Sequence, residues 1–600
     1  MKGVNGIVLE INLSTGEIKK LPVSEKIYRQ FLGGRALGMR LLKDYLIEPG
    51  IDPASPENPL MFMPGLFCGF PIPNSSRTCM VTKSPITSPK NSTYPYASTV
   101  SYSNMGGFIG PEIKFAGYDG IIFIGKSEIP VYLFIENETI ELRDASKFWG
   151  MGTNSFETAI IEEIGDRRFE TAYIGTGAEN GVLFSSVINT GARAAGRGGT
   201  GYVMGTKKLK AIVVRGTCMP EIFDHKNYVD LLSQIRLSFG AESESKKDWR
   251  YGGTANALQF SSDRGSQAVK NYSEGSFADI EKINVHAARV QVWKRDMACY
   301  SCQLSCKKSG FAKGAYGGIV NEGIEYETGT MLGANLLVTD LNGLHKMIEI
   351  ADDYGIDIIT LGNVIGFLME CYDKKLIDST FLNGIDLKWG DVGASIELIH
   401  LIGKNTGIGK EASKGVKHLA SVIGKGSSDF AIHVKGHELA AWNVQGYAKS
   451  FGISYTTANR GACHMTGGEI AGQNLSVLRD SMGMCNFASS WYKNDLHYRH
   501  FIFALTGIAL TEDEFQHTGE RMFNIERMMN CNEGFTREDD MLPERFFKDA
   551  YTSGPQKDVV LDRNEFSKIM DEYYLSRGWK VSSGIPEEST LQKLELEFLL

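Results

Sequence analysis

The chain has 600 residues, of which 42% are hydrophobic and 22% are charged, and its formal net charge is -8 at pH 7. This balance is typical of a folded protein, and a chain of this length is expected to form about two to four domains. The negative charge and the lack of a long basic run exclude an extended nucleic-acid-binding surface.

The first residues, MKGVNGIVLEINLSTGEI, lack the basic and apolar segments of a signal peptide and predict a strand, a turn and a second strand. The best candidate for a membrane span, GIIFIGKSEIPVYLFI, is interrupted by Lys126, Glu128 and Pro130. No uninterrupted apolar stretch approaches the ~18–20 residues that a span needs. We therefore expect a cytoplasmic protein without membrane contact.

Short β-type runs dominate the first part of the chain. GIVLEINL, GIIFIG, PVYLFIE and KAIVVRG are separated by clusters of turn residues. These runs predict a β-rich domain over residues 1–215.

Helical periodicity dominates the rest. LNGLHKMIEIADDYG, TLGNVIGFLMECYDKK, ASIELIHLIGKNTG, EDEFQHTGERMFNIERMMN and RNEFSKIMDEYYLSRG place apolar residues three and four positions apart. Together with the β-rich start, they predict an α+β fold with a helical domain over residues 216–420 and a second helical domain over residues 421–600.

Three of the ten cysteines form a cluster. Cys299, Cys302 and Cys306 have the spacing C-x2-C-x3-C, and the remaining seven are scattered. A closed zinc site needs four nitrogen or sulfur ligands, and no Cys or His follows within about ten residues. Three near thiolates plus one distant cysteine is the ligand pattern of many [4Fe-4S] clusters. The scattered cysteines are expected to be buried apolar residues unless one of them completes the cluster.

A second pattern, D-x-x-G, occurs twice, over 352–357 as DDYGID and over 480–485 as DSMGMC. Each copy follows an apolar helical run, and each glycine stands where a helix would end in the left-handed conformation. The aspartate then lies in the last turn, where the helix dipole disfavours a negative charge, so it requires a compensating donor. Two such helix ends could bind two similar heterocycles, although simple capping would explain either copy alone. Because Cys485 ends the second copy, we choose it as the fourth cluster ligand.

The sequence resembles the tungsten-containing aldehyde ferredoxin oxidoreductase family, as a large catalytic subunit, along nearly its whole length. The resemblance rests on motifs that occur in family order: INLSTGEI, FLGGRALGMRLL, TKSPIT, GPEIKFAGYDGIIFIGK, RAAGRGGTGYVMGTKKLKAI, CYSCQLSC, EGIEYETGTMLGANL, ANRGACH and DSMGMC. It implies a β-rich first domain and two helical domains that enclose a bis-molybdopterin cofactor with tungsten or molybdenum.

The resemblance also implies the binding residues. One [4Fe-4S] cluster would be bound by Cys299, Cys302, Cys306 and Cys485. The positions that match contacts to the pterins or their phosphates are Arg77, Asn104, Gly106, Gly107, Arg193, Ala194, Gly196, Arg197, Asp352, Gly355, Ile356, Asp357, Arg460, Asp480, Gly483 and Met484. Asn104 and Ala194 match backbone carbonyls that help to bind a Mg²⁺ ion between the phosphates.

These residue types suit that chemistry. Arginine forks bind phosphate with two hydrogen bonds, and the small residues of RAAGRGG allow close backbone approach, although a tight surface turn would also explain this motif. Mg²⁺ prefers oxygen ligands and keeps several waters.

Glu327 and His464 match positions beside the metal. The implied reaction is oxidation of an aldehyde or its hydrate, with Glu327 as general base and His464 donating a hydrogen bond to the carbonyl oxygen. Glu322 and Glu325 are alternative candidates for the general base, and only the alignment to the family motif favours Glu327 over them. A lone histidine in a glycine-rich loop, such as His464, is more often structural than catalytic.

The sequence departs from the family pattern in three places. Where some members have an E-x-x-H iron site between subunits, this chain has Lys346-Met347-Ile348-Glu349, which predicts no bridging iron and leaves dimerisation open. Residues 91–103, NSTYPYASTVSYS, are additional, and we hypothesise that they form a docking or substrate-entry surface. The stretch between His464 and Cys485 is shorter than in the family member with which we compare the sequence.

Two other functions stay open. A related tungsten enzyme reduces an aromatic acyl-CoA, which would require a nucleotide-sized entry channel. An electron-relay subunit without its own chemistry would leave the pterin-contact residues without a purpose. Since only one cluster is encoded, we expect an external electron partner, either ferredoxin or a small multi-cluster iron–sulfur subunit.

Overall fold

The computed structural model describes residues 1–240, 244–492 and 495–599. Its first part contains two six-stranded mixed sheets, as the β-rich pattern predicts. The first sheet has the order β2-β1-β6-β3-β4-β5 and consists of β1 (Ile7–Asn12), β2 (Ile18–Pro22), β3 (Leu60–Pro64), β4 (Thr78–Lys83), β5 (Val100–Met105) and β6 (Gly120–Ile124). The second has the order β11-β10-β9-β12-β7-β8 and consists of β7 (Val131–Glu136), β8 (Thr139–Asp144), β9 (Glu170–Tyr173), β10 (Val187–Asn189), β11 (Arg193–Ala195) and β12 (Leu209–Arg215).

Helices α3 (Ile109–Phe115) and α6 (Thr200–Thr206) lie between the two sheets and contact both. Their apolar side chains join those of the facing strands in one core that includes Phe62, Ile113 and Met204. The opposite face of the second sheet is covered by α4 (Thr153–Ile164). The first region is therefore a layered unit in which every sheet face that carries apolar residues is buried.

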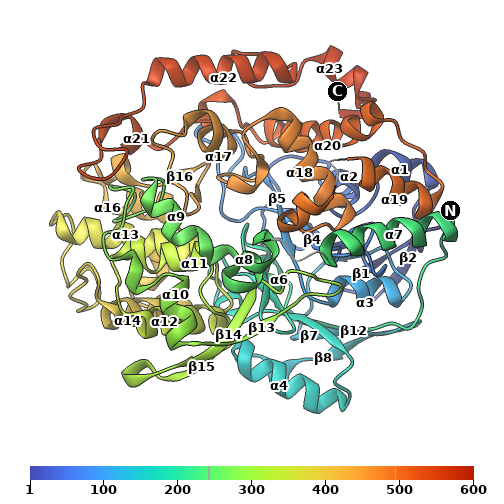
Figure 1. Cartoon of the computed structure of the whole chain (residues 1–600), viewed down its shortest axis with the longest axis horizontal. Coiled ribbons are helices and arrows are strands. Elements are labelled where there is room, and N and C mark those ends of the chain that lie inside the picture. The colour runs from blue at the N-terminus through green and yellow to red at the C-terminus, as the bar shows by residue number, and fades with distance from the viewer. Residues whose placement is uncertain (241–243, 493–494, 600) are drawn as a thin grey trace.

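Helix α2 (Gly34–Tyr45) connects this unit to the helical part of the chain. It packs on β3 and β4, where Gly38 faces Met63 and Val81, and it also contacts α18 (Ile470–Met482) and α20 (Glu512–Asn532). Because one face meets a sheet and another meets two helices, all residues from Gly34 to Met39 are buried, the charged Arg35 included. The helix thereby fixes the position of the C-terminal helices relative to the first sheet (Figure 1).

The remaining chain is mainly helical, as predicted. The helices not yet named are α1 (Glu25–Phe31), α5 (Thr176–Glu179), α7 (His225–Gly240), α8 (Glu244–Gly252), α9 (Ala257–Asp263), α10 (Val285–Gln291), α11 (Tyr326–Met331), α12 (Leu341–Tyr354), α13 (Ile358–Asp373), α14 (Val392–Gly403), α15 (Gly409–Ala412), α16 (Val416–Ile423), α17 (Ile453–Thr457), α19 (Leu496–Thr506), α21 (Arg545–Lys548), α22 (Arg563–Arg577) and α23 (Glu588–Lys593). The five helical patterns of the sequence correspond to α12, α13, α14, α20 and α22.

Two small sheets interrupt the helical part, where the sequence predicts mainly helices. The larger one has the order β13-β14-β15, with β13 (Trp293–Met297), β14 (Lys307–Ala312) and β15 (Gly318–Val320); the smaller pairs β16 (His433–Val434) with β17 (His437–Glu438). The strand sequences WKRDM and KKSGFA carry charged residues without an apolar alternation, so their pattern does not predict strands.

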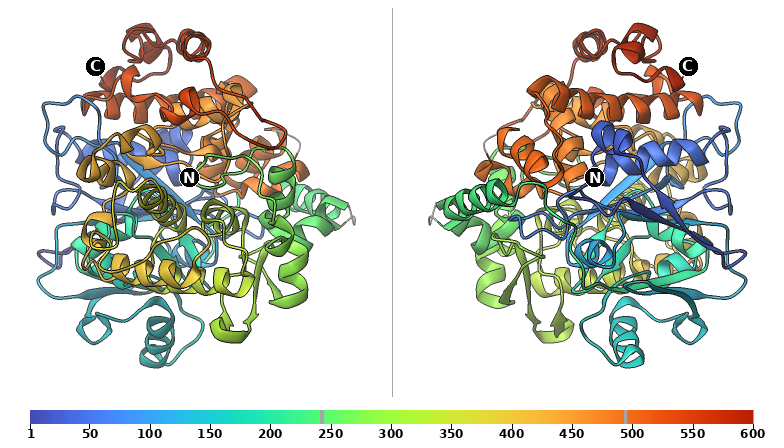
Figure 2. Two further views of the ribbon diagram at one scale, coloured as in Figure 1. Left: turned by 90° about the vertical axis from the view of Figure 1, so that its left-hand side faces the viewer. Right: turned by 90° about the vertical axis from the view of Figure 1, so that its right-hand side faces the viewer.

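The overall arrangement is layered along one axis. Figure 2 shows the C-terminal helices α22 and α23 at one end of the molecule and α4 at the opposite end. Among the described residues, no helix is both long enough and apolar enough to span a membrane.

Candidate active site

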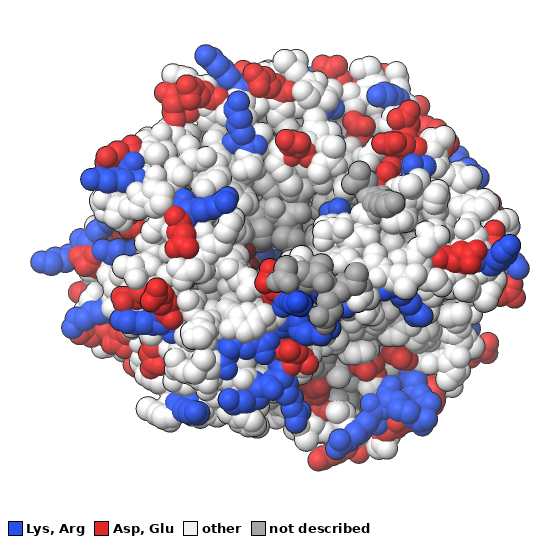
Figure 3. Space-filling view, in the orientation of Figure 1, with Lys and Arg blue, Asp and Glu red and all other residues white. Residues whose placement is uncertain are grey.

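A cavity of about 710 Å³ lies between the sheet-rich region and the helices. Its walls come from β5, β11, α8, α11, the loop between β13 and β14, and the segments on both sides of α18. The face of the molecule drawn in Figure 3 is hollowed near its centre, above the place where α8 lies in Figure 1. A space of this size can enclose a large cofactor.

All four cysteines predicted to bind the cluster line this cavity. Cys299, Cys302 and Cys306 lie in the loop between β13 and β14, and Cys485 follows the end of α18. Asn74 joins the two segments, because its side-chain amide donates to the Cys302 Sγ atom at 3.2 Å and its carbonyl accepts from the Cys485 N–H at 2.9 Å. The fold therefore brings together cysteines that are far apart in sequence.

The described residues contain no group of three His, Cys, Asp or Glu side chains that converge on a single metal ion. This finding is compatible with a cubane, because each thiolate binds a different iron corner. Burial raises the pKa of the Cys306 thiol to about 12, so a cationic ligand is required to keep it as a thiolate. Arg77 supplies positive charge at the same place, since its Nη2 atom lies 3.6 Å from the Cys485 Sγ atom.

Gly106 explains how the first domain approaches this loop. A Cβ atom added at Gly106 would lie only 2.8 Å from the Cys299 Sγ atom. Any larger residue would therefore displace the thiol, and the glycine is needed for close packing between the end of β5 and the cysteine loop.

The second D-x-x-G copy has the predicted geometry. Helix α18 ends at Gly483, which has a left-handed φ of 80°, and Asp480 lies in its last turn. The Asp480 Oδ2 atom accepts a hydrogen bond from Arg35 Nη1 at 3.1 Å. Arg35 is the compensating donor that an aspartate at a helix C-terminus requires, and sequence reasoning did not identify it.

Arg35 is the centre of a buried network. Its side chain is fully buried, and its Nε and Nη2 atoms donate to both carboxylate oxygens of Glu526 at 2.9 and 2.8 Å. Its guanidinium also lies 3.4 Å from the ring centre of Tyr102. The network ties α2 to α18 and α20, and the glycines of the FLGGRALG motif permit it: a Cβ atom added at Gly34 would lie 2.4 Å from the Asp480 carbonyl oxygen.

The first D-x-x-G copy differs from the second electrostatically. Helix α12 ends at Gly355, with a left-handed φ of 67°, but the buried Asp352 Oδ2 atom has no hydrogen-bond partner within the described part of the chain. Burial, together with the nearby Glu322 and Glu349 carboxylates, raises the Asp352 pKa well above its usual value. Among the described residues, Asp352 therefore lacks the paired arginine that Asp480 has, and its carboxyl group favours the neutral form.

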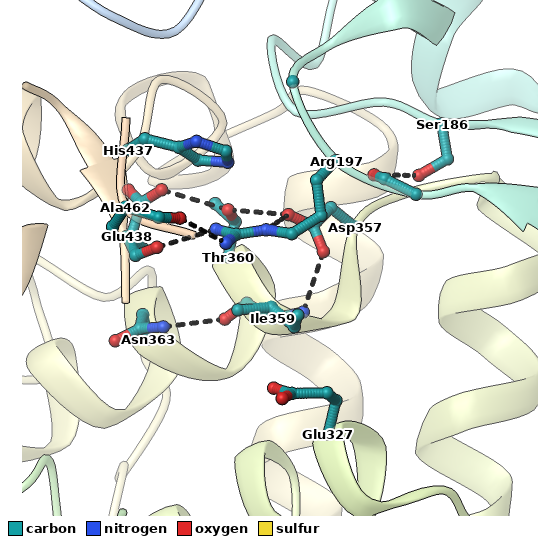
Figure 4. A network of polar contacts seen from close by, with 12 residues as sticks. Ser186, Arg197, Glu327, Asp357, Ile359, Thr360, Asn363, His437, Glu438 and Ala462 are labelled. Atoms are coloured by element: carbon teal, nitrogen blue, oxygen red, sulfur yellow. Dashed lines mark hydrogen bonds and ion pairs between the residues drawn. The ribbon is translucent and has the colours of Figure 1, made fainter. Parts of the chain in front are cut away.

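Asp357, which ends the first copy, caps α13 and pairs with Arg197. The Asp357 Oδ2 atom accepts from Arg197 Nε at 3.2 Å, while the two other guanidinium nitrogens donate to the carbonyls of Ala462 and Glu438 at 2.9 and 2.7 Å. Figure 4 shows Arg197 between these three segments. Although Arg197 lines the cavity, its guanidinium is used to join protein segments and is not free to bind phosphate through all its donors.

Other predicted contact residues carry unpaired polar atoms. In the described structure the Asn104 Oδ1, Arg193 Nη2 and Arg460 Nε atoms are buried without a hydrogen-bond partner, and all three residues line the cavity. Buried polar groups are normally paired, so these atoms indicate a polar ligand in the cavity. Asn104 in β5 and Ala194 in β11 come from contacting strands, which places both near the same wall. Unpaired guanidinium donors fit anionic phosphates.

Some predicted residues do not reach the cavity surface. Within the described residues, the lining includes Arg77, Gly106, Gly196, Met484 and Asp480. It does not include Gly107, Asp352, Gly355, Ile356, Asp357 and Gly483. Several of these lie one layer behind the surface, as Asp357 does behind Arg197.

Glu327 and His464 lie side by side in the cavity wall. The His464 Nε2 atom lies 3.4 Å from the Glu327 Oε1 atom, and the Glu327 Oε2 atom accepts the Ala441 N–H at 2.8 Å. Burial raises the pKa of Glu327 to about 7 and lowers that of His464 to about 3. The rivals Glu322 and Glu325 also line the cavity, but Glu327 has the contact with His464.

Two functional candidates were missed from the sequence. Tyr102 lines the cavity with the Arg35 and Arg460 guanidinium groups over its ring. Cys463 also lines it and lies 3.0 Å from Arg460 Nη2; although burial acts in the opposite sense, Arg460 lowers the Cys463 pKa below its usual value. The ANRGACH motif was the available signal for Cys463. The expectation that scattered cysteines are buried is wrong for Cys218, which is exposed in the connection after β12.

The additional segment lies mainly against the C-terminal region. The Ser92 hydroxyl donates to the Glu533 carbonyl at 2.9 Å, and the Ser98 N–H donates to the Glu533 carboxylate at 3.2 Å. Only its last part, in β5, reaches the cavity through Tyr102 and Ser103. Its role in docking or substrate entry stays a hypothesis.

The comparisons with known proteins agree over the whole chain. Residues 8–216 match the family model for the aldehyde ferredoxin oxidoreductase N-terminal domain, and residues 230–596 match the model for domains 2 and 3 of the same family. The tungsten-containing aldehyde ferredoxin oxidoreductase of Pyrococcus abyssi is 34% identical over 627 aligned positions that cover 100% of both chains.

One further relative and one solved structure differ in their named activity. The aliphatic sulfonate oxidoreductase, WOR-like subunit, of Pyrococcus furiosus is 31% identical, covering 99% of this chain and 97% of its own. Among solved structures, a chain of the active-site complex BamBC of benzoyl coenzyme A reductase superposes with a TM-score of 0.83 at 23% identity, covering 100% of this chain and 98% of its own, which demonstrates a shared fold. By the family models and the full-length identity, the chain belongs to the aldehyde ferredoxin oxidoreductase family and is an oxidoreductase.

Proposed function

We propose that the chain oxidises aldehydes to carboxylic acids at a tungsten bis-molybdopterin centre and passes the electrons through one [4Fe-4S] cluster to an external iron–sulfur partner. One observation carries the proposal: the Glu327–His464 pair and the four candidate cluster cysteines line the same cavity. The tungsten named for the Pyrococcus abyssi relative supports the choice of metal.

The residues present fit the cofactor. The cavity volume of about 710 Å³ and the unpaired Arg193 and Arg460 donors supply space and positive charge for the phosphate groups of the pterins. Asn104 and Ala194 would present backbone carbonyls to Mg²⁺, which prefers oxygen ligands. Bound there, the metal centre would supply the two-electron redox chemistry that side chains do not provide.

The protein's part in the reaction is proton transfer and orientation. Glu327 has one oxygen fixed by the Ala441 N–H, which leaves Oε1 to accept a proton from water or the aldehyde hydrate. His464 is neutral above about pH 3 and can donate one N–H to the substrate carbonyl oxygen or to Glu327. Both side chains are mostly covered by the cavity wall, with 17% of His464 and 21% of Glu327 exposed.

The aromatic acyl-CoA alternative has weaker support. The benzoyl coenzyme A reductase chain is 23% identical, whereas the Pyrococcus abyssi aldehyde enzyme is 34% identical over its full length. An electron-relay role without chemistry would leave Glu327 and His464 unexplained.

The test is anaerobic purification, metal analysis by mass spectrometry and an assay of aldehyde-dependent dye reduction. We expect about one tungsten and about four irons per chain with turnover of simple aldehydes. Tungsten and iron without aldehyde turnover would favour an acyl-CoA or sulfonate substrate. Absence of both metals from active protein would reject the cofactor assignment.

A further inference from the structure

Basic side chains gather beside the loop that carries Cys299, Cys302 and Cys306. An open cavity of about 370 Å³ there is lined by Lys246, Lys247, Arg250, Tyr251, Arg289 and Asp296. The next basic residues along β13, Lys294 and Arg295, are exposed. We refer to Lys246, Lys247, Arg250, Arg289, Lys294 and Arg295 as the basic patch.

The basic patch stands out against the charge of the whole chain, which is -8. Figure 3 shows Lys and Arg side chains gathered below the central hollow of this face. The nearby Asp296 carboxylate lies 2.8 Å from Arg289 Nη2 and 3.2 Å from Lys308 Nζ, so its charge is largely compensated. A local positive field on a negative molecule attracts an acidic partner to one place and orients it.

The patch is fixed to the cysteine loop by hydrogen bonds. Arg289 donates to the carbonyls of Tyr251 and Arg250, each at 2.7 Å, and so joins α10 to the end of α8. The Lys308 Nζ atom donates to the Arg250 carbonyl at 2.6 Å and to the Ser305 carbonyl at 3.0 Å. Ser305 precedes Cys306, so one side chain connects the patch to a candidate cluster ligand.

An aromatic pair makes a second connection. Trp249, next to Arg250 in α8, stacks on Phe487 with ring centres 4.7 Å apart. Phe487 follows Cys485 by two residues, and both aromatic side chains line the cavity together with the cysteines. The patch is therefore close to all the candidate cluster ligands.

Apolar side chains lie among the basic ones. Tyr251 is 47% exposed and Val290 is 64% exposed, beside Arg250 and Arg289 respectively. Apolar contact area with a charged surround is typical of small, transient protein interfaces.

We propose that the basic patch docks a small acidic iron–sulfur electron carrier. The proposal rests on the proposed function and specifies where its electrons leave. One aldehyde and one water give one carboxylate, three protons and two electrons, and the electrons reduce two oxidised carriers by one electron each. Two carriers must dock and leave in each turnover, which a weak, salt-dependent interface permits.

The experiment compares two doubly charge-reversed full-length holoenzymes. The patch variant is Lys294→Glu with Arg295→Glu, and the control is Arg167→Glu with Lys568→Glu, which makes the same charge change at exposed positions elsewhere. Binding of a purified acidic [4Fe-4S] ferredoxin is measured by surface plasmon resonance at low and high salt. Aldehyde oxidation is measured with that ferredoxin and with a small dye.

In the patch variant we expect the Kd and the ferredoxin KM to rise about tenfold at low salt, with dye reduction unchanged and the difference reduced at high salt. The control should bind as the wild type does. Equal binding by all three proteins, or equal weakening in patch variant and control, overturns the docking proposal.

If the patch variant melts earlier than the wild type, the neutral pair Lys294→Gln with Arg295→Gln replaces it, with about a threefold expected effect. Because binding is measured without aldehyde, the two proposals fail separately. The wild type could oxidise no aldehyde while the patch variant still binds ferredoxin more weakly than the wild type does. That result rejects the proposed reaction and retains the docking surface.

Discussion

The Nε2 atom of His464 lies 3.4 Å from the Oε1 atom of Glu327, although 137 positions separate these residues in the numbering and they belong to different segments of the cavity wall. Burial shifts the two pKa values apart, to about 3 for His464 and about 7 for Glu327. Near neutral pH the histidine is therefore a neutral donor, and the glutamate is the group that changes its protonation state. This separation assigns the two residues different roles in proton transfer.

The first prediction concerns pH. Glu327 is protonated and inactive as a base below its pKa, and it is ionised and active above it, so kcat/KM should rise as pH increases through about 7. The measurement is aldehyde-dependent dye reduction between about pH 5.5 and 8.5, below and above this pKa. A profile that is flat over this range would exclude Glu327 as the base.

The second prediction concerns Glu327→Gln. Loss of the proton acceptor should lower kcat by about 10²–10⁴-fold, with tungsten and iron contents unchanged. Glu322→Gln is the matched control, because Glu322 lines the same cavity but Glu327 makes the contact with His464. The control should change kcat by less than about tenfold; a larger loss in the control would transfer the role to Glu322.

The third prediction concerns His464→Asn. Removing the donor should lower kcat by about 10²–10³-fold, but the rise of kcat/KM near pH 7 should stay, since His464 titrates far below it. The pH profile of the variant is the measurement. Disappearance of the rise would mean that the histidine produces it.

The fourth prediction concerns the cluster. Cys485→Ala should lower iron from about four per chain and abolish the electron paramagnetic resonance signal of the reduced cluster. Cys371→Ala provides the control, because Cys371 is buried within α13 and does not line the cavity. A Cys485→Ala protein with full iron content would show that another residue is the fourth ligand.

The fifth prediction concerns Arg35→Met. The substitution leaves the buried Glu526 and Asp480 carboxylates without their cation, which costs about 3–5 kcal/mol and should lower the melting temperature. Arg40→Met, later in the same helix, breaks a partly exposed pair with Asp44 that contributes about 0–1 kcal/mol. Similar melting temperatures for the two variants would contradict a stabilising role for the Arg35 network.

Local features were predictable from the sequence because they depend on neighbouring residues. Gly355 and Gly483 end α12 and α18 in the left-handed conformation, as the D-x-x-G pattern predicts. The helical periodicities were confirmed for the same reason. The cysteine spacing placed three thiols in one loop, and the structure adds Cys485 to the same cavity.

Contacts between distant segments could not be predicted in this way. Arg35 and Asp480 are 445 positions apart, and no periodicity in either segment indicates that they meet. The resemblance assigned Arg197 to cofactor contact, which stays a prediction, and no local pattern indicates that its guanidinium also contacts the Asp357 carboxylate and two carbonyls. Burial, which sets the Glu327 pKa, is also a property of the assembled fold.

The walls of the main cavity extend along the chain from Asn74 to Phe487. A nascent chain that has completed only the two six-stranded sheets has made Arg77 and Arg193, but neither Glu327 nor the four candidate cluster cysteines. Neither the sheet-rich region nor the helical part of the chain alone contains the complete lining. The cavity is therefore complete only after synthesis has passed Phe487, and the two halves of the chain, produced separately, should each lack a complete cavity.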